Sequence, residues 1–164
     1  MDALLLARIQ FAATALYHYL FVPLSVGFGL VLAVLMTKAY RSRDPHDEAL
    51  ASFWLRLFAG TFAVGVATGI TMEFSFGTNW ADYSRFVGDI FGAPLAAEAL
   101  FAFFMESVFL GVLLFGKNKV SRGFYLASGW LVWAGSLLSC LWINIANSWM
   151  QTPAGYEVIQ TAAG

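Results

Sequence analysis

Four long stretches of the chain are almost entirely apolar, and polar segments separate them. The stretches cover residues 11–36, 53–72, 93–116 and 124–146. The first of them, FAATALYHYLFVPLSVGFGLVLAVLM, contains no formal charge. About 20 consecutive apolar residues are enough for an α-helix to cross the hydrocarbon core of a bilayer. Because a backbone in lipid must satisfy its own hydrogen bonds, each stretch predicts a transmembrane helix.

The polar connections differ in character. Residues 38–50 and 117–122 form short, charged connections. Residues 73–92 form a longer one, in which aromatic residues alternate with Gly and Asn, so we expect a loop or a short helix at the membrane surface. Asp89 lies shortly before Gly92 and Pro94, an order that suits the N-cap of the third helix.

The composition agrees with a membrane location. The 164 residues are 60% hydrophobic and only 12% charged, whereas soluble domains contain about 25% charged residues. A net charge of -1 without a basic patch argues against binding to nucleic acid. The single cysteine, Cys140, rules out an internal disulfide and a cysteine-cluster metal site. We therefore predict an all-α integral membrane protein with four transmembrane helices.

Basic residues predict the orientation of these helices. The connections after the first and third stretches hold six of the nine basic residues, namely Lys38, Arg41, Arg43, Lys117, Lys119 and Arg122. Arg8 and Arg85 belong to the opposite side. Since cytoplasmic loops carry an excess of Lys and Arg, both termini are expected on the outer side of the membrane.

Three ionisable residues stand out within the apolar stretches: His18, Glu98 and Glu106. Such residues are costly in a membrane and usually mark a function. In an α-helix, Glu98 and Glu106 would be about 12 Å apart along the axis and about 80° apart around it. This arrangement suits a proton path that includes both carboxyl groups. It also suits one carboxyl group acting as a ligand and the other as a proton relay. His18 suits haem ligation or proton chemistry, and the alternative is a hydrogen bond between helices.

Other polar positions have weaker interpretations. The fourth stretch carries a stripe of polar residues, namely Ser136, Ser139, Cys140, Asn144 and Asn147. This polar stripe either lines a water-filled path or holds two helices together by hydrogen bonds, and we favour the second interpretation. Gly65 and Gly69 form a GxxxG motif, which is typical of close helix packing. Glu73 lies near the membrane interface, where solvation and function are equally plausible. His46 is expected to be a solvated loop residue.

Long stretches of this sequence resemble subunit I of the cytochrome bd quinol oxidases. They are RIQFAATALYHYLFVPLSVGFG at 8–29, GVATGITMEFSFGTNW at 65–80, VGDIFGAPLAAEALFAFFMES at 87–107 and SLLSCLWINIANSWMQTP at 136–153. Together they extend the resemblance over nearly the whole chain. Runs of this length are far more specific than any short motif in the sequence.

The resemblance implies a haem-containing subunit of a terminal oxidase that passes electrons from quinol to O2, forming water and a membrane potential. Such enzymes carry a low-spin haem b, a high-spin haem b and a haem d. His18 falls on the family's axial ligand of a high-spin haem, either haem b or haem d. Glu98 matches a glutamate that contacts a haem or donates protons. Glu106 matches a glutamate of the proton route, and Ser107 and Ser139 match positions that line this route.

The resemblance also implies partners and a location. The partners are subunit II, a small accessory subunit, quinol, O2 and membrane lipid. The location is the cytoplasmic (inner) membrane of a bacterium or archaeon, with the N-terminus on the periplasmic side. Because subunit I of this family is a longer, nine-span protein, we expect the chain to be the N-terminal portion of a larger helical bundle. The ligands of the low-spin haem b would then lie outside it, and the chain alone would be inactive.

Two other functions are compatible with the residues. The first is a haem-free, proton-coupled membrane transporter, in which His18, Glu98 and Glu106 form a relay. The second is a non-catalytic truncated fragment that only packs against other subunits. Composition does not separate the transporter from the oxidase, but the long matching stretches favour the oxidase.

Overall fold

The structure is a computed structural model that describes residues 2–158, and its regular elements in that range are all helices. They are α1 (Ala3–Ser42), α2 (Pro45–Gly77), α3 (Ala81–Ala97), the π-helix η1 (Glu98–Phe103), α4 (Phe104–Phe115) and α5 (Arg122–Gln151). The segments α3, η1 and α4 follow one another without a break and form one long helix of 35 residues. The described part of the chain thus has four helices long and apolar enough to cross a membrane, which confirms the predicted fold class.

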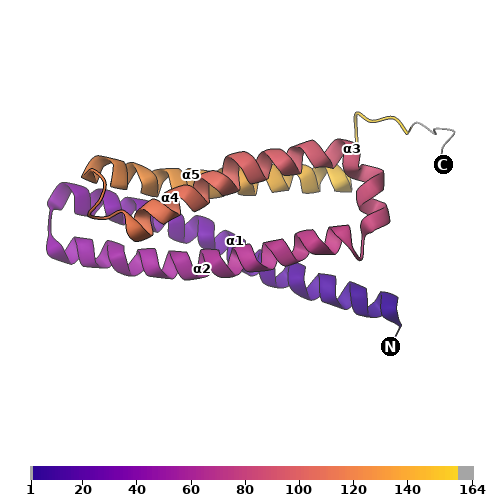
Figure 1. Ribbon diagram of the computed structural model, residues 1–164, viewed down its shortest axis with the longest axis horizontal. Coiled ribbons are helices and arrows are strands. Elements are labelled where there is room, and N and C mark those ends of the chain that lie inside the picture. Colours follow the sequence, from indigo (N-terminus) through magenta and orange to yellow (C-terminus); the bar gives the residue numbers. More distant parts are fainter. Residues whose placement is uncertain (1, 159–164) are drawn as a thin grey trace.

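The four long helices run side by side as a bundle (Figure 1). Helix α1 packs mainly against α2 and also against α5, while α4 packs against α5. The N-terminal part of α1 diverges from the other helices towards the end of the bundle where α2 finishes (Figure 1). Pro23 lies inside α1, which continues through it without interruption.

Side-chain caps and a left-handed residue define the reversal between α1 and α2. Arg43 ends α1 with φ 57°, and its backbone N–H donates to the carbonyl of Ala39. Asp44 then caps α2 by accepting a hydrogen bond from the backbone N–H of His46. Pro45 occupies the first helical position, where the missing N–H has no partner to lose. His46 is exposed as predicted, but it lies in the first turn of α2 rather than in a loop.

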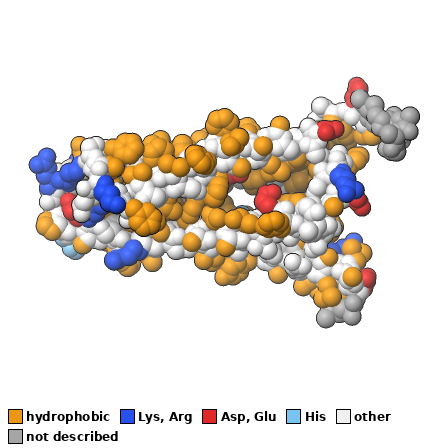
Figure 2. Space-filling view, in the orientation of Figure 1, with side chains coloured by type: hydrophobic (Ala, Val, Ile, Leu, Met, Phe, Trp, Pro, Cys, Tyr) orange, Lys and Arg blue, Asp and Glu red, His pale blue; other side chains and the backbone are white. Residues whose placement is uncertain are grey.

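The continuous buried core lies in the half of the bundle next to the charged connections. Its members come from the end of α1, the start of α2, α4 and the first half of α5, and include Leu32, Met36, Leu55, Phe58, Leu110, Leu113 and Val132. The other half is looser, and Figure 2 shows a hollow there between α2 and the helix that contains α3, with acidic side chains at its wall. The bundle therefore combines a tightly packed half with a half that is less tightly packed.

In residues 73–92 the structure has more helix than expected, and the expected cap at Asp89 was wrong. Only Thr78–Trp80 is a turn, because α2 continues to Gly77 and α3 begins at Ala81, and the first turns of α3 cross the end of the bundle (Figure 1). Asp89 is exposed in the middle of α3 and does not cap it. Each glycine inside a helix lowers its stability by about 1 kcal/mol relative to Ala, so Gly88 and Gly92 disfavour a helix here. Tertiary packing overrides this low helix propensity. Here Phe91 is buried against Trp149 of α5, with ring centroids 5.1 Å apart.

Candidate functional site

His18 in α1 is held by the backbone and a side chain of α2. Its Nδ1 atom lies 3.0 Å from the carbonyl oxygen of Gly65 and 3.1 Å from the hydroxyl oxygen of Thr68. A carbonyl oxygen only accepts hydrogen bonds, so Nδ1 must carry the proton and donate it. In the neutral imidazole, the lone pair is then on the other ring nitrogen, Nε2. No hydrogen bond to Nε2 is found within residues 2–158.

The glycines of the GxxxG motif allow this contact. A Cβ atom on Gly69 would lie only 3.0 Å from Cε1 of His18 and 3.7 Å from its Nε2. A Cβ atom on Gly65 would meet the Cβ of Phe21 at 3.7 Å, an ordinary van der Waals distance. Both glycines thus face α1, and the close packing predicted from the motif is confirmed. The imidazole ring lies over Gly69, where a larger residue would crowd it.

Two carboxylates of the third long helix meet serines of α5. Ser139 donates a hydrogen bond to Oε1 of Glu98, which is half-buried, at 2.5 Å. Ser136 donates to Oε1 of Glu106, which is only 5% exposed. Serine hydroxyls both donate and accept hydrogen bonds, so they can support either protonation state of a carboxyl group. Glu98 and Glu106 therefore each have a polar partner on the neighbouring helix.

A π-helical segment changes the predicted angle between these carboxylates. The angle of about 80° assumed α-helical geometry, but the six residues Glu98–Phe103 form the π-helix η1. A π-helix bonds i→i+5 and turns less per residue, which brings Glu98 and Glu106 nearer to one face. The serines that they meet are three residues apart on α5 and so share a face as well. Short π-helical segments are frequent at functional sites.

The remaining predicted positions are arranged differently. Ser107 follows Glu106 in α4 and is half-buried, and its side chain makes no hydrogen bond to another residue in the range 2–158. Asn144 is exposed and donates to the carbonyl of Cys140 within its own helix, at 2.8 Å. The polar stripe of α5 thus divides into serines that bridge helices and an asparagine that does not.

The donor set fits a haem better than a bare metal ion. The described residues contain no group of three or more His, Cys, Asp or Glu side chains that could hold a metal ion. A haem needs only one or two protein ligands, because its porphyrin supplies the others. His18 offers one such ligand through Nε2, and it lies outside the buried core near the charged connections.

Comparison with known proteins identifies the family. The family model described as cytochrome bd terminal oxidase subunit I matches residues 6–163. The chain belongs to this family. It is 51% identical over 158 residues to the cytochrome bd ubiquinol oxidase subunit 1 of Bacillus subtilis (strain 168), covering 96% of this chain and 34% of that protein. It is 53% identical over 154 residues to the cytochrome bd-II ubiquinol oxidase subunit 1 of Escherichia coli (strain K12), covering 94% of this chain and 30% of that protein.

A solved structure of this family has the same fold. The bd oxidase from Geobacillus thermodenitrificans matches with a TM-score of 0.84 and 33% sequence identity, covering 95% of this chain and 36% of that one. The resemblance seen in the motifs is therefore confirmed, and family membership implies haem cofactors in general. The chain spans about a third of the length of the relatives that it matches. Its four apolar helices and its family make it a multi-pass membrane protein.

Sequence reasoning missed two residues of this site. Ser136 was included in the polar stripe, but nothing in the sequence paired it with Glu106. Thr68 was not singled out, although it lies three residues after Gly65 and one before Gly69, on the motif that faces α1. The GxxxG spacing was the available signal, because it indicated which face of α2 would meet the helix of His18.

Proposed function

We propose that this chain forms part of the haem-carrying subunit of a cytochrome bd-type terminal oxidase, which transfers electrons from quinol to O2. In the complete complex it would act with subunit II, and with a small accessory subunit, in the cytoplasmic membrane of a bacterium or archaeon. The observation that carries the proposal is the state of His18. A histidine inside a membrane span has its Nδ1 hydrogen-bonded to Gly65 and Thr68, and its Nε2 has no hydrogen-bond partner among residues 2–158.

His18 is proposed as the axial ligand of a high-spin haem, either haem b or haem d. A haem-ligating histidine needs a nitrogen lone pair, and the protonated Nδ1 leaves that lone pair on Nε2. When bound, the haem supplies the iron at which O2 is reduced. Glu98, half-buried at the start of η1, is proposed as a second contact to the haem. The ligands of a low-spin haem b would come from outside this chain.

The carboxylate–serine pairs support a proton path towards this site. Glu106 lies further along the helix than Glu98 and so nearer to the charged connection at residues 117–122. We propose that protons pass Glu106 and reach Glu98, with Ser107 and Ser139 along the route as predicted from the resemblance. To this route we add Ser136, which donates to the buried carboxylate of Glu106.

The distribution of basic residues supports the proposed orientation. Figure 2 shows Lys and Arg side chains gathered at the end of the bundle that holds the α1–α2 and α4–α5 connections. The positive-inside rule assigns such an end to the cytoplasm. Protons would then enter from the cytoplasm and contribute to a membrane potential, and the N-terminus would lie on the periplasmic side.

The proposal is tested by optical spectra of the complete oxidase complex carrying His18→Ala. Reduced-minus-oxidised spectra should lose the signal of one high-spin haem while the low-spin haem b signal remains. The matched control is His46→Ala, because His46 is exposed at the start of α2 and should leave the spectra unchanged. An assembled His18→Ala complex with the full set of haem signals would overturn the ligand role. A colourless wild-type complex would instead favour a proton-coupled transporter.

A further inference from the structure

We propose that Thr68 and Gly69 are positioning residues for His18, which together fix the tautomer and the plane of its ring. This inference rests on the proposed haem-ligand role of His18 and goes beyond it by naming the residues that prepare the ligand. They lie next to each other on α2, on the face that packs against α1.

The tautomer follows from the two acceptors at Nδ1. The Gly65 carbonyl, 3.0 Å away, has no proton to give and therefore requires N–H at Nδ1. The Thr68 hydroxyl can donate its own proton to the carbonyl of Val64 or of Gly65, each 2.9 Å away. Its oxygen then presents a lone pair to Nδ1, 3.1 Å away. Both acceptors thus favour the tautomer that leaves Nε2 free.

The second acceptor also restricts rotation of the ring. With the Gly65 carbonyl alone, the imidazole could tilt around a single hydrogen bond. The Thr68 hydroxyl oxygen, which lies 2.9 Å from the Gly65 carbonyl oxygen, adds a second acceptor for the same N–H group. Threonine hydroxyls in helices commonly bond a carbonyl of the preceding turn, so the position of this acceptor is set by α2 itself. The direction of the Nε2 lone pair is therefore fixed before a ligand binds.

Gly69 supplies the space that this ring position requires. A Cβ atom there would approach Cε1 of His18 to 3.0 Å and Nδ1 to 3.5 Å. The ring could give way only by lengthening its bonds to Gly65 and Thr68. Substitution of Gly69 by Ala should therefore act on the ligand geometry, although Ala is the better helix former. Removing the hydrogen-bond partner of a metal-binding histidine typically lowers the affinity for the metal by about 10–100-fold.

The test uses the complete oxidase complex with Thr68→Val, Thr68→Ser and Gly69→Ala. Thr68→Val keeps the branched shape and removes the hydroxyl, whereas Thr68→Ser restores the hydroxyl. The matched controls are Thr71→Val and Gly60→Ala. Within residues 2–158, the Thr71 hydroxyl bonds only the carbonyl of Ala67, and a Cβ atom on Gly60 would meet nothing within 4 Å. Two quantities are measured: haem per polypeptide after dialysis against apomyoglobin, and the iron–histidine stretching frequency by resonance Raman spectroscopy.

We expect Thr68→Val and Gly69→Ala to weaken retention of the high-spin haem by about 10–100-fold and to shift the iron–histidine frequency. Thr68→Ser and both controls should match the wild type. Equal haem retention and frequencies in Thr68→Val and Thr71→Val would overturn the inference. The Thr68→Val and Thr68→Ser pair decides the outcome even if Gly69→Ala does not assemble, because neither change adds volume.

A parallel His18→Ala complex separates the two proposals. If His18→Ala keeps all its haem, the proposed function of His18 fails and the positioning role fails with it. If His18→Ala loses a high-spin haem while Thr68→Val and Gly69→Ala behave like their controls, only the positioning role fails.

Discussion

Ser136 of α5 donates a hydrogen bond to the carboxylate of Glu106 in α4, and both residues are only 5% exposed. Ser136 lies next to Gly135, whose missing side chain leaves the space for Glu106 to approach α5. The pair therefore combines a polar contact with a close helix approach. The Ser136–Glu106 pair lies between the tightly packed core near the charged connections and the looser half of the bundle, which holds His18.

Replacing Ser136 by Ala should destabilise the complex, because it leaves the buried carboxyl group of Glu106 without its partner on α5. Hydrogen bonds between membrane helices contribute about 0.6 kcal/mol on average and up to about 1.7 kcal/mol. We expect a lower thermal denaturation midpoint in detergent and slower turnover of quinol. The matched control is Ser128→Ala, because the Ser128 hydroxyl is buried but, among the described residues, bonds only the Phe124 carbonyl of its own helix. Equal midpoints for both variants would contradict this account of Ser136.

Replacing Gly135 by Ala should also disturb Glu106. The new Cβ atom would lie 2.5 Å from Cγ of Glu106 and 3.4 Å from the carbonyl oxygen of Ala102. Overpacking of this kind costs about 1–3 kcal/mol, which outweighs the gain in helix propensity. We expect a lower thermal midpoint for Gly135→Ala. Gly123→Ala in the same helix should be neutral or stabilising, because a Cβ atom there meets nothing within 4 Å. A Gly135→Ala complex as stable as Gly123→Ala would count against the contact.

Replacing Glu106 by Gln should separate proton transfer from haem binding. The amide keeps an oxygen for Ser136 and nearly the same volume, but it does not take up and release protons at neutral pH. Loss of a positioned acid–base group typically slows a reaction by about 10²–10⁴-fold. We expect quinol oxidation to fall by at least about tenfold with the haem content preserved. The control is Asp89→Asn, since Asp89 is an exposed carboxylate in α3. Normal turnover in the Glu106→Gln complex would remove this residue from the proton path.

The apolar stretches predicted the four long helices, because length and hydropathy alone decide whether a helix can cross a membrane. The pairing of Ser136 with Glu106 could not be predicted, because it depends on how α5 is rotated against α4. The π-helix at Glu98 was equally hidden, since it needs only one change in hydrogen-bond register. The extent of helix in residues 73–92 was underestimated, because the burial of Phe91 against Trp149 is a tertiary effect.

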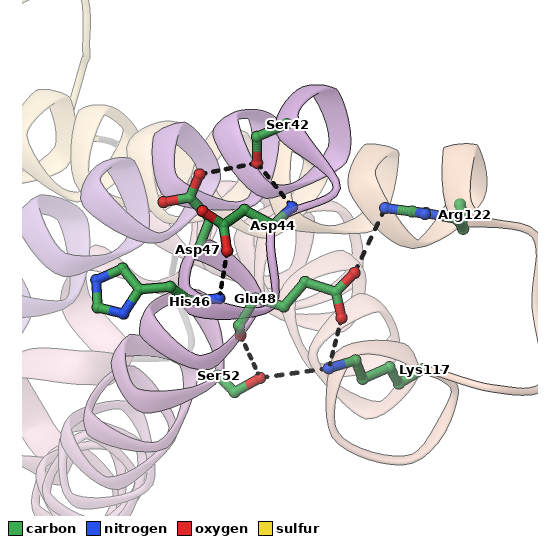
Figure 3. Close-up of polar contacts among 8 residues, drawn as sticks. All are labelled: Ser42, Asp44, His46, Asp47, Glu48, Ser52, Lys117 and Arg122. Atoms are coloured by element: carbon green, nitrogen blue, oxygen red, sulfur yellow. Dashed lines mark hydrogen bonds and ion pairs between the residues drawn. The ribbon is translucent and has the colours of Figure 1, made fainter.

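Acidic residues at the start of α2 form ion pairs with basic residues at the same end of the bundle. Figure 3 shows Glu48 between Lys117 and Arg122, at distances of 3.8 Å and 3.5 Å respectively. These side chains are partly exposed, and exposed ion pairs contribute only about 0–1 kcal/mol. Asp47 is different because it is only 5% exposed, lies 2.8 Å from Nζ of Lys38 and accepts a hydrogen bond from Ser42 at 2.8 Å.

Replacing Asp47 by Asn should therefore destabilise the complex in a pH-dependent manner. Asp47 lies in the first turn of α2, before the apolar stretch 53–72, and the hydrogen bonds from Lys38 and Ser42 hold the pKa of its carboxyl group below the usual value. A lowered folded-state pKa stabilises the fold above the unfolded-state pKa of about 3.9, and this contribution disappears as the pH falls through the folded-state pKa. We expect Asp47→Asn to have a lower thermal midpoint than the wild type at pH 7, and the difference should narrow below about pH 3.9.

The control is Asp82→Asn. Asp82 lies 3.6 Å from Arg85 on α3, and both side chains are exposed, so their ion pair contributes little to stability. The thermal midpoint of Asp82→Asn should therefore match that of the wild type at pH 7. A difference between Asp47→Asn and the wild type that stays constant down to pH values well below 3.9 would show that the carboxylate charge is not what stabilises this end of the bundle.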